Sequence, residues 1–273
     1  LALMAYAVAE DERVQTPVMV NLDGFALTHT YETVEVPSSE QADAFLPPYQ
    51  TKNRFDFEHP TNIGFSAGPE YNRYFKYQEH QDLLNAPAVI EEVEQRFAQV
   101  FGRRYPGLVE AVQCEDADYV LVTLGSAAGL VRTVVESLRA QGLRVGLLRI
   151  RYLRPLPTVV LAAALGNAKA VAVLEKDVSF GAEGTVFTNV NSALQQAGVR
   201  VPTYDFIGGL GGDDITPVQV EAIFRTLVRF VSEGAEVPRV SFLGIDGTPG
   251  DAASAASPKD LASDACRNVK EEN

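Results

Sequence analysis

The sequence predicts an α/β protein whose core is an open, mostly parallel sheet flanked by helices. Between residues 118 and 231, short apolar segments alternate with longer segments of helical periodicity. The apolar segments have no polar face, which is typical of strands in a parallel sheet that crossover helices cover on both sides. With 46% apolar residues, the 273-residue chain can bury one or two cores of ordinary size.

The first 36 residues predict a helix, a strand and a loop. Leu1 to Val8 is an alanine-rich apolar helix without an N-cap residue, and the charged residues 11–13 end it before a strand at Pro17 to Leu22. An α/β unit does not normally begin with its last helix. We therefore expect the chain to start inside a domain, of which residues 1–36 are the C-terminal remnant.

Residues 37–117 are expected to form a crossover loop and one long helix. From 37 to about 77, proline, asparagine, glycine and aromatic residues leave no periodic pattern. A loop of this length is uncommon unless it is functional or wraps a neighbour, and aromatic residues are not typical of a disordered tether. We expect it to be ordered and packed on a partner surface. Residues 78–105 then show helical spacing, with Gly102 near the end of the helix.

Residues 118–231 are expected to form one compact α/β domain. The predicted strands are 119–124, 144–150, 170–175 and 201–207, and the predicted helices are 127–141, 157–165, 181–197 and 216–231. The last helix has the clearest start, because Thr216 supplies an N-cap hydroxyl, Pro217 suits the first helical position and Gln219 stands three residues after the cap.

The C-terminal segment 232–273 is expected to hold one short strand and a tail. The strand is predicted at 239–245. Beyond it, residues 246–273 are rich in Gly, Ala, Ser, Asp and Pro, which favours a flexible acidic tail.

Composition excludes several classes of function. A formal charge of −13 and a pI near 4.7 disfavour binding to nucleic acid or to an anionic membrane, since both need a basic surface. No apolar run reaches roughly 18 residues and no signal peptide is present, so we expect a cytoplasmic protein. Cys114 and Cys266 lack the spacing of an iron–sulfur or zinc site, and the three histidines lack metal-ligand spacing. We expect no metal site in this chain.

Three loops at the expected carboxyl edge of the sheet each allow two interpretations. Gly125 to Gly129 follows a strand and opens a helix, which suits either a nucleotide site or tight strand-to-helix packing. Gly208 to Asp214 can cradle a phosphate or fit against another subunit, and its paired aspartates disfavour phosphate. In the loop Ser179 to Gly184, Glu183 is either a general base or a residue that compensates the helix dipole.

Asp23, Thr28 and His29 follow the predicted strand at Pro17 to Leu22. A carboxylate beside a histidine is a common acid–base arrangement, because the pair titrates near neutral pH. The alternative is a hydrogen-bonded loop at a domain junction. The chain by itself shows no complete catalytic set.

Six ordered blocks resemble the C-terminal part of the α subunit of pyruvate:ferredoxin oxidoreductase, one of the 2-oxoacid:ferredoxin oxidoreductases. The blocks are 17–25 (PVMVNLDGF), 28–29 (TH), 45–49 (FLPPY), 146–157 (GLLRIRYLRPLP), 179–184 (SFGAEG) and 207–217 (IGGLGGDDITP). The resemblance runs from residue 1 to about 231, and it does not cover the tail from residue 246.

The resemblance implies an enzyme that oxidatively decarboxylates pyruvate with thiamine diphosphate and Mg²⁺, transfers the acetyl group to coenzyme A and passes electrons through iron–sulfur clusters to ferredoxin. It implies that residues 1–36 end a thiamine pyrimidine-binding domain and that residues 118–231 form a transketolase C-terminal-like domain. The cofactors are then held mainly by segments outside this sequence and by β-, γ- and δ-type partner subunits.

The resemblance does not transfer catalytic or cofactor-binding residues, because the family's thiamine-facing segments, including the glutamate that activates the aminopyrimidine, have no counterpart here. Asp23, Thr28 and His29 are the candidates nearest the substrate chamber. Three alternatives remain: a non-catalytic assembly or dimerisation module, an enzyme for another 2-oxoacid such as 2-oxoglutarate or a branched-chain acid, and a free-standing nucleotide-binding domain that uses Gly125 to Gly129.

Overall fold

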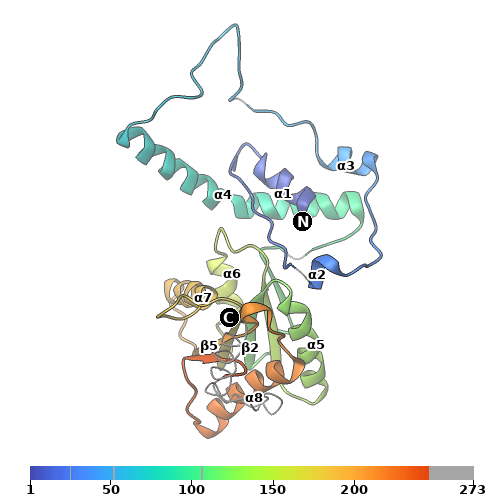
Figure 1. The fold of residues 1–273 in the computed structure, drawn as a ribbon, viewed down its shortest axis with the longest axis vertical. Coiled ribbons are helices and arrows are strands. Elements are labelled where there is room, and N and C mark those ends of the chain that lie inside the picture. Colours follow the sequence, from blue (N-terminus) through green and yellow to red (C-terminus); the bar gives the residue numbers. More distant parts are fainter. Residues whose placement is uncertain (25, 52, 106, 246–273) are drawn as a thin grey trace, which may run out of the picture. The chain divides into compact units, whose positions relative to one another are not determined.

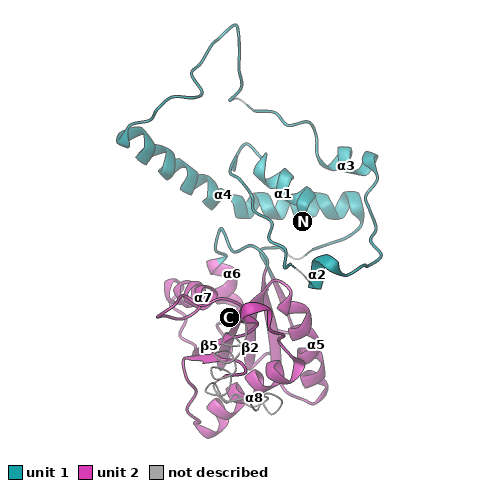
Figure 2. Ribbon diagram, viewed as in Figure 1, with its two compact units in different colours: residues 1–109, 151–157 teal, residues 110–150, 158–273 magenta. Residues whose placement is uncertain are grey.

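A computed structural model of the chain describes residues 1–245 except 25, 52 and 106 (Figure 1). The chain divides into two units (Figure 2). Unit 1 contains residues 1–109 and 151–157, and unit 2 contains residues 110–150 together with the chain from 158 onward. The acidic tail predicted at 246–273 lies outside the described residues.

Unit 2 contains a six-stranded sheet with the order β1-β3-β2-β4-β5-β6. Its strands are β1 (Val109–Val112), β2 (Tyr119–Leu124), β3 (Val145–Ile150), β4 (Ala170–Glu175), β5 (Thr203–Ile207) and β6 (Val240–Phe242). The neighbouring strands from β3 to β6 pair in parallel. The predicted open parallel sheet is thus confirmed.

Helices cover both faces of this sheet (Figure 1). They are α5 (Ala127–Ala140), α6 (Thr158–Leu165), α7 (Thr185–Gln196) and α8 (Pro217–Glu233). On one face, α5 and α8 bury a core with Leu121, Ala172 and Phe206 of the central strands. Because strand side chains alternate between faces, the remaining residues of β4 and β5 face α7.

The predicted start of α8 is confirmed in detail. The backbone N–H of Gln219 donates to Thr216 Oγ1 at 3.3 Å, and the N–H of Thr216 donates to Gln219 Oε1 at 2.9 Å. This reciprocal capping box satisfies two N–H groups that no helical carbonyl can reach. At the other end, Gly234 ends α8 with a φ of +67°, a left-handed conformation that glycine adopts without strain.

Unit 1 consists of helices joined by long loops. They are α1 (Ala2–Ala9), α2 (Ala26–His29), α3 (Ser39–Phe45) and α4 (Pro69–Phe101). Its core lies where α1 and α3 pack on the C-terminal half of α4, around Met4, Phe45, Ile90 and Phe97. The rings of Phe45 and Phe97 meet edge to face with centroids 5.4 Å apart.

The strand predicted at Pro17 to Leu22 is wrong, since residues 15–24 adopt no regular structure. A strand is stable only when a neighbouring strand accepts and donates its backbone hydrogen bonds. The described part of unit 1 offers no such neighbour to this segment. Its apolar side chains consequently stay on the surface, with Met19 83% and Leu22 75% exposed.

The expected loop from 37 to 77 contains more helix than predicted. Ser38 caps α3 in a capping box with Gln41, and α4 begins at Pro69, nine residues before the predicted start at Gln78. Proline at the first helical position is a start signal that the sequence contains. The helix ends at Phe101, four residues before the predicted end at 105, because Gly102 follows it in a left-handed conformation with a φ of +65°.

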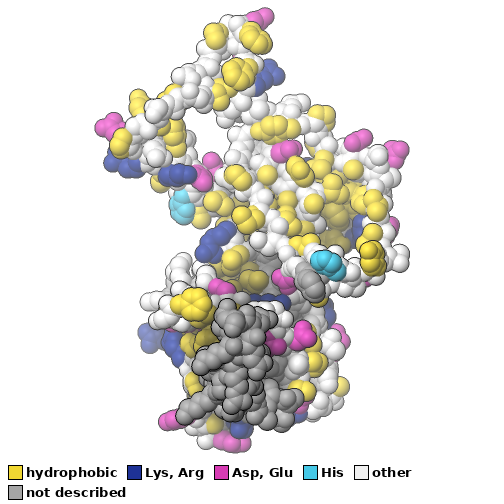
Figure 3. Space-filling view, viewed as in Figure 1, with side chains coloured by type: hydrophobic (Ala, Val, Ile, Leu, Met, Phe, Trp, Pro, Cys, Tyr) yellow, Lys and Arg dark blue, Asp and Glu magenta, His cyan; other side chains and the backbone are white. Residues whose placement is uncertain are grey.

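Large hydrophobic side chains lie on the surface of unit 1 (Figure 3). They gather in two segments, residues 18–36 and residues 49–77, and include Tyr31, Val36, Phe55 and Phe57, each more than 75% exposed. Exposed patches of this kind are typical of protein–protein contact surfaces.

None of the described helices combines the length and apolar character that a membrane span requires.

Candidate functional site

The candidates Asp23, Thr28 and His29 lie in one loop and short helix of unit 1. Asp23 is half-buried in the loop before α2, and Thr28 and His29 are exposed on α2. Thr28 Oγ1 lies 3.3 Å from His29 Nδ1, and Thr30 Oγ1 donates to the carbonyl of Ala26 at 2.5 Å. The structure thus places the three candidates on a stretch of seven residues, with the threonine hydroxyl directly beside the imidazole.

In unit 2, the carboxyl ends of the parallel strands define a second candidate region. The chain leaves β2 for β3 on one side and later returns to β4 on the other side, so the strand order reverses between β2 and β4. Open α/β sheets bind ligands in the crevice at such a switch point. The loops after β2, β4 and β5 border this edge, and they are the glycine-rich loops that the sequence singles out.

Lys176 connects the loops on the two sides of the switch point. Its Nζ donates to Ser126 Oγ at 3.2 Å, which joins the loop after β4 to the start of α5. Gly209, in the loop after β5, approaches the same side chain, because a Cβ at this position would lie 3.3 Å from Lys176 Cε. The N–H of Gly208 donates to the carbonyl of Glu175 at 3.0 Å. These contacts hold the three loops together at one edge.

Two buried carboxyl groups lie beneath the loop after β4. Glu175 ends β4 and Asp205 lies in β5, and the two residues are 4% and 0% exposed. Glu175 accepts the N–H groups of Val186 and Phe187 at 2.7 and 2.8 Å, and Asp205 Oδ2 accepts the N–H of Gly184 at 2.8 Å. Side chains of β4 and β5 therefore accept the free N–H groups at the N-terminus of α7.

Glu183 was expected to be either a general base or a dipole-compensating residue for α7. The structure shows it half-buried at 3.8 Å from Arg239 Nη2, while Glu175 and Asp205 receive the free N–H groups of the helix. These two carboxyl groups were missed, because they stand 11 to 21 residues from the N–H groups that they accept. Their only sequence signal is the presence of acids in otherwise apolar strands.

The loop after β5 contains a short 3₁₀ turn, Leu210–Gly212. Gly209, directly before the turn, and Gly211 and Gly212 within it have positive φ values. Asp213 and Asp214 follow it and are exposed. Whether the loop fits against another subunit or binds a phosphate stays a prediction.

Cys114 is buried, its Sγ donates to the carbonyl of Leu147 at 3.2 Å, and burial raises the pKa of its thiol to about 11. Cys266 lies outside the described residues. Among the residues that the structure describes, His, Cys, Asp and Glu side chains do not gather in groups that could hold a metal ion.

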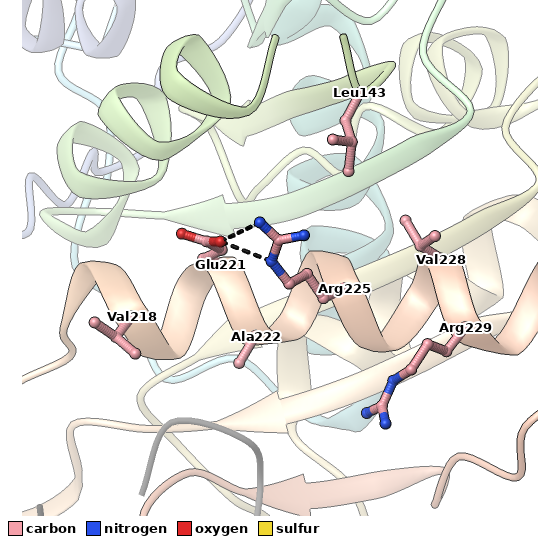
Figure 4. Close-up of a pocket in the computed structure, with 7 residues that line it drawn as sticks. All are labelled: Leu143, Val218, Glu221, Ala222, Arg225, Val228 and Arg229. Atoms are coloured by element: carbon pink, nitrogen blue, oxygen red, sulfur yellow. Dashed lines mark hydrogen bonds and ion pairs between the residues drawn. The ribbon is translucent and has the colours of Figure 1, made fainter. Parts of the chain in front are cut away.

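A shallow groove of about 470 Å³ lies along α8 (Figure 4). It is lined by Leu143, Val218, Glu221, Ala222, Arg225, Val228 and Arg229. Glu221 and Arg225 pair with each other within α8, with a hydrogen bond of 2.7 Å. The carboxylate of Glu221 is thus already paired with Arg225, and the other lining side chains are mostly apolar.

Comparison with protein families gives two matches in sequence order. Residues 1–95 match the family described as pyruvate flavodoxin/ferredoxin oxidoreductase, thiamine diphosphate-binding, and residues 117–220 match pyruvate:ferredoxin oxidoreductase core domain II. The first match contains Asp23, Thr28 and His29. The second contains β2 to β5 and the edge of the sheet described above.

Similar proteins agree with these matches. The chain is 41% identical over 223 residues to pyruvate synthase subunit PorA of Methanothermobacter thermautotrophicus, covering 82% of this chain and 57% of the relative. It is 39% identical over 233 residues to ketoisovalerate oxidoreductase subunit VorA of Pyrococcus horikoshii, covering 85% and 59%. The chain thus spans less than two thirds of the length of these relatives.

Among solved structures, the chain is similar to a 2-oxoglutarate:ferredoxin oxidoreductase from Magnetococcus marinus with 2-oxoglutarate, coenzyme A and succinyl-CoA bound. The TM-score is 0.40 at 18% identity, over 60% of this chain and 24% of that chain.

Proposed function

Since the chain belongs to the family of 2-oxoacid:ferredoxin oxidoreductase α subunits, we propose that it is part of an enzyme that oxidises and decarboxylates pyruvate. The acetyl group passes to coenzyme A and the electrons pass to ferredoxin. The observation that carries this proposal is the succession of the two family matches along the chain, a thiamine diphosphate-binding segment followed by core domain II. We also propose a cytoplasmic location.

Pyruvate is the proposed substrate because several pyruvate synthase subunits match over most of the chain, with 41% identity for the subunit of Methanothermobacter thermautotrophicus. A ketoisovalerate oxidoreductase subunit follows at 39% identity. This small difference keeps a branched-chain 2-oxoacid as the second candidate substrate.

The described residues of this chain do not enclose a thiamine diphosphate site by themselves. Thr28 and His29 are exposed on α2, and the preceding segment with Met19 and Leu22 is open and apolar. Such a segment is suited to form one wall of a chamber that other segments complete. We propose that Asp23, Thr28 and His29 face this chamber, and that the cofactor, its Mg²⁺ and the iron–sulfur clusters are held mainly outside this chain.

We propose β-, γ- and δ-type subunits of the same complex as the partners of this chain, and ferredoxin as the partner of the complex. The relatives are themselves named as subunits. The exposed aromatic side chains of residues 49–77 support the proposal, because aromatic residues are enriched at the centres of protein interfaces.

A chimeric enzyme tests the proposed function. In it, this chain replaces the matching part of the PorA subunit of Methanothermobacter thermautotrophicus, co-expressed with the other subunits of that pyruvate synthase. We expect the purified complex to reduce methyl viologen when pyruvate and coenzyme A are present, and to do so faster than with 2-oxoglutarate or ketoisovalerate. An assembled complex, verified by size-exclusion chromatography, that reduces the dye with none of the three acids contradicts the proposal.

His29→Ala in the chimera separates a catalytic contribution from a purely structural one. If His29 faces the substrate chamber and takes part in proton transfer, kcat is expected to fall by about 10²-fold. His80→Ala is the matched control, because His80 is exposed on α4 and is expected to leave kcat unchanged. Full turnover of the assembled His29→Ala complex would instead favour the alternative that the chain is a non-catalytic assembly module.

A further inference from the structure

The N-terminus of α7 is capped in an unusual way. Its N-cap residue is Gly184, which has no side chain to accept a hydrogen bond, and its first turn contains no acidic residue. The N–H groups of Gly184, Val186 and Phe187 all donate instead to Glu175 and Asp205 of the sheet. Hydrogen bonds to the carboxyl groups of Glu175 and Asp205 therefore fix the first turn of α7, and with it the end of the loop from Lys176 to Glu183.

The two carboxyl groups have more negative charge than the helix can compensate. The N-terminus of a helix is equivalent to about half a positive elementary charge, so it stabilises one carboxylate and not two. Both groups are buried, and Asp205 Oδ1 has no hydrogen-bond partner among the described residues. A buried carboxylate oxygen without a donor is strongly destabilising unless a proton is present nearby.

Among the described residues, neighbouring carboxyl groups add to the negative charge of this site. From the loop, Asp177 and Glu183 add negative charge, and Lys176 points to Ser126 Oγ. Arg239 Nη2 lies 3.8 Å from Glu183 Oε1, and its guanidinium lies over the ring of Phe187 in α7. The sequences of α6 and of the first turn of α7 contain no charged residue.

We propose that Glu175 and Asp205 share one proton at neutral pH, and that loss of this proton releases the loop 176–184 and the first turn of α7. The pair is then a pH-sensitive latch at the carboxyl edge of the sheet. In the ionised state two carboxylates repel each other in a buried site, and opening the loop lets water reach them. This inference is independent of the function proposed above.

The pKa values of both groups agree with a shared proton. Burial, together with the neighbouring carboxyl groups, raises the pKa of Glu175 to about 8, against the lowering effect of the two N–H donors. Burial likewise raises the pKa of Asp205 above its usual range. An acid whose pKa is raised by folding binds its proton more tightly in the folded state, so stability falls as the pH rises from about 4.5 to about 8.

Hydrogen–deuterium exchange on the full chain tests the latch. Exchange is measured at pH 6 and pH 9 and corrected for the intrinsic pH dependence of amide exchange. We expect the protection of peptides spanning 177–190 to fall at least tenfold at pH 9, while peptides of α5 and α8 keep theirs. Equal protection of 177–190 at both pH values, or an equal loss throughout unit 2, would overturn the proposal.

Three variants test whether Glu175 and Asp205 cause the loss of protection at pH 9. Glu175→Gln and Asp205→Asn each leave at most one negative charge in the site, so peptides 177–190 are expected to stay equally protected at pH 6 and pH 9. Asp214→Asn is the matched control, since it removes an exposed carboxylate from the loop after β5 and keeps the pair and its neighbour Asp177; it retains the loss at pH 9. A tenfold loss that persists in both pair variants contradicts the latch.

Discussion

Gly184→Ala is expected to destabilise unit 2 by about 3–4 kcal/mol, although it adds a single methyl group. The backbone of Gly184 has φ −69° and ψ 155°, an extended conformation that any residue adopts. A Cβ at this position would, however, overlap the carboxyl group of Glu175. Overpacking a buried site costs about 2 kcal/mol, and displacing the carboxyl group from the N–H groups of α7 adds about 1–2 kcal/mol.

Urea unfolding followed by circular dichroism measures this effect, and Gly129→Ala is the matched control. Gly129 lies inside α5, and a Cβ there meets no atom within 4 Å. Alanine in a helix interior is more favourable than glycine, so Gly129→Ala is expected to stabilise by about 0.5–1 kcal/mol. A Gly184→Ala protein within 1 kcal/mol of the wild type would show that the carboxyl group is not fixed against the glycine.

A double-mutant cycle identifies the atoms responsible. Glu175→Ala removes the carboxyl group that the new methyl group would meet, so Gly184→Ala should destabilise much less in that background. Directly contacting residues show interaction free energies of about 0.5–3 kcal/mol in such cycles. An additive result would mean that the glycine is needed for another reason.

The parallel sheet could be predicted closely because its signal is local and uninterrupted. The limits of β2 and β4 agree with the predicted strands at 119–124 and 170–175, since both are apolar on both faces, and β2 is followed by Gly125 while β4 ends at Glu175. The start of α8 was equally predictable, because a hydroxyl, a proline and a glutamine at fixed spacing satisfy the free N–H groups from within one turn.

Elements that depend on distant partners were predicted poorly. The sequence at Pro17 to Leu22 has the composition of a strand, but composition does not provide the neighbour that a strand requires. The four-residue β1 was missed because it is short and lies at the edge of the sheet. The α7 cap shows the same limit, since its acceptors come from two strands and only the folded sheet brings them to the helix.

The candidate site was predictable as a segment and not as an arrangement of groups. Asp23, Thr28 and His29 follow from their residue types, and their proximity follows from their spacing in the sequence. Their role stays a prediction, because the substrate chamber proposed for them depends on groups outside this chain. The carboxyl edge of the sheet could be predicted from the alternation of strands and helices, whereas the switch point between β2 and β4 and the contact between Lys176 and Ser126 required the structure.

A buried ion pair in unit 1 leads to the second large expected effect. Arg151 Nη1 donates to Glu94 Oε1 at 2.6 Å and to the carbonyl of Gly107 at 2.8 Å, and both charged side chains are 7% exposed. The pair fastens the segment 151–157 to α4. Burial raises the pKa of Glu94 even though the charge of Arg151 opposes the shift, which indicates how strongly this site disfavours a lone carboxylate.

Arg151→Met is expected to destabilise unit 1 by about 3–5 kcal/mol at pH 7, because it leaves a buried carboxylate without its cation. Arg225→Met is the matched control, since Arg225 pairs with Glu221 on the exposed side of α8 and its loss is expected to change stability by less than about 1 kcal/mol. Both free energies of unfolding are measured in urea. Equal effects of the two substitutions would contradict the structural importance of the buried pair.

The pH dependence of Arg151→Met separates lost charge pairing from lost packing. Without the arginine, the pKa of Glu94 rises further in the folded state, so folding takes up a proton and the variant loses stability as the pH rises from about 4.5. The deficit against the wild type should therefore be smaller at pH 4.5 than at pH 7. Adding Glu94→Gln removes the charge and should recover part of the stability at pH 7. A deficit that is independent of pH and unaffected by Glu94→Gln would assign the effect to the contacts of the guanidinium with Tyr105 and Tyr152.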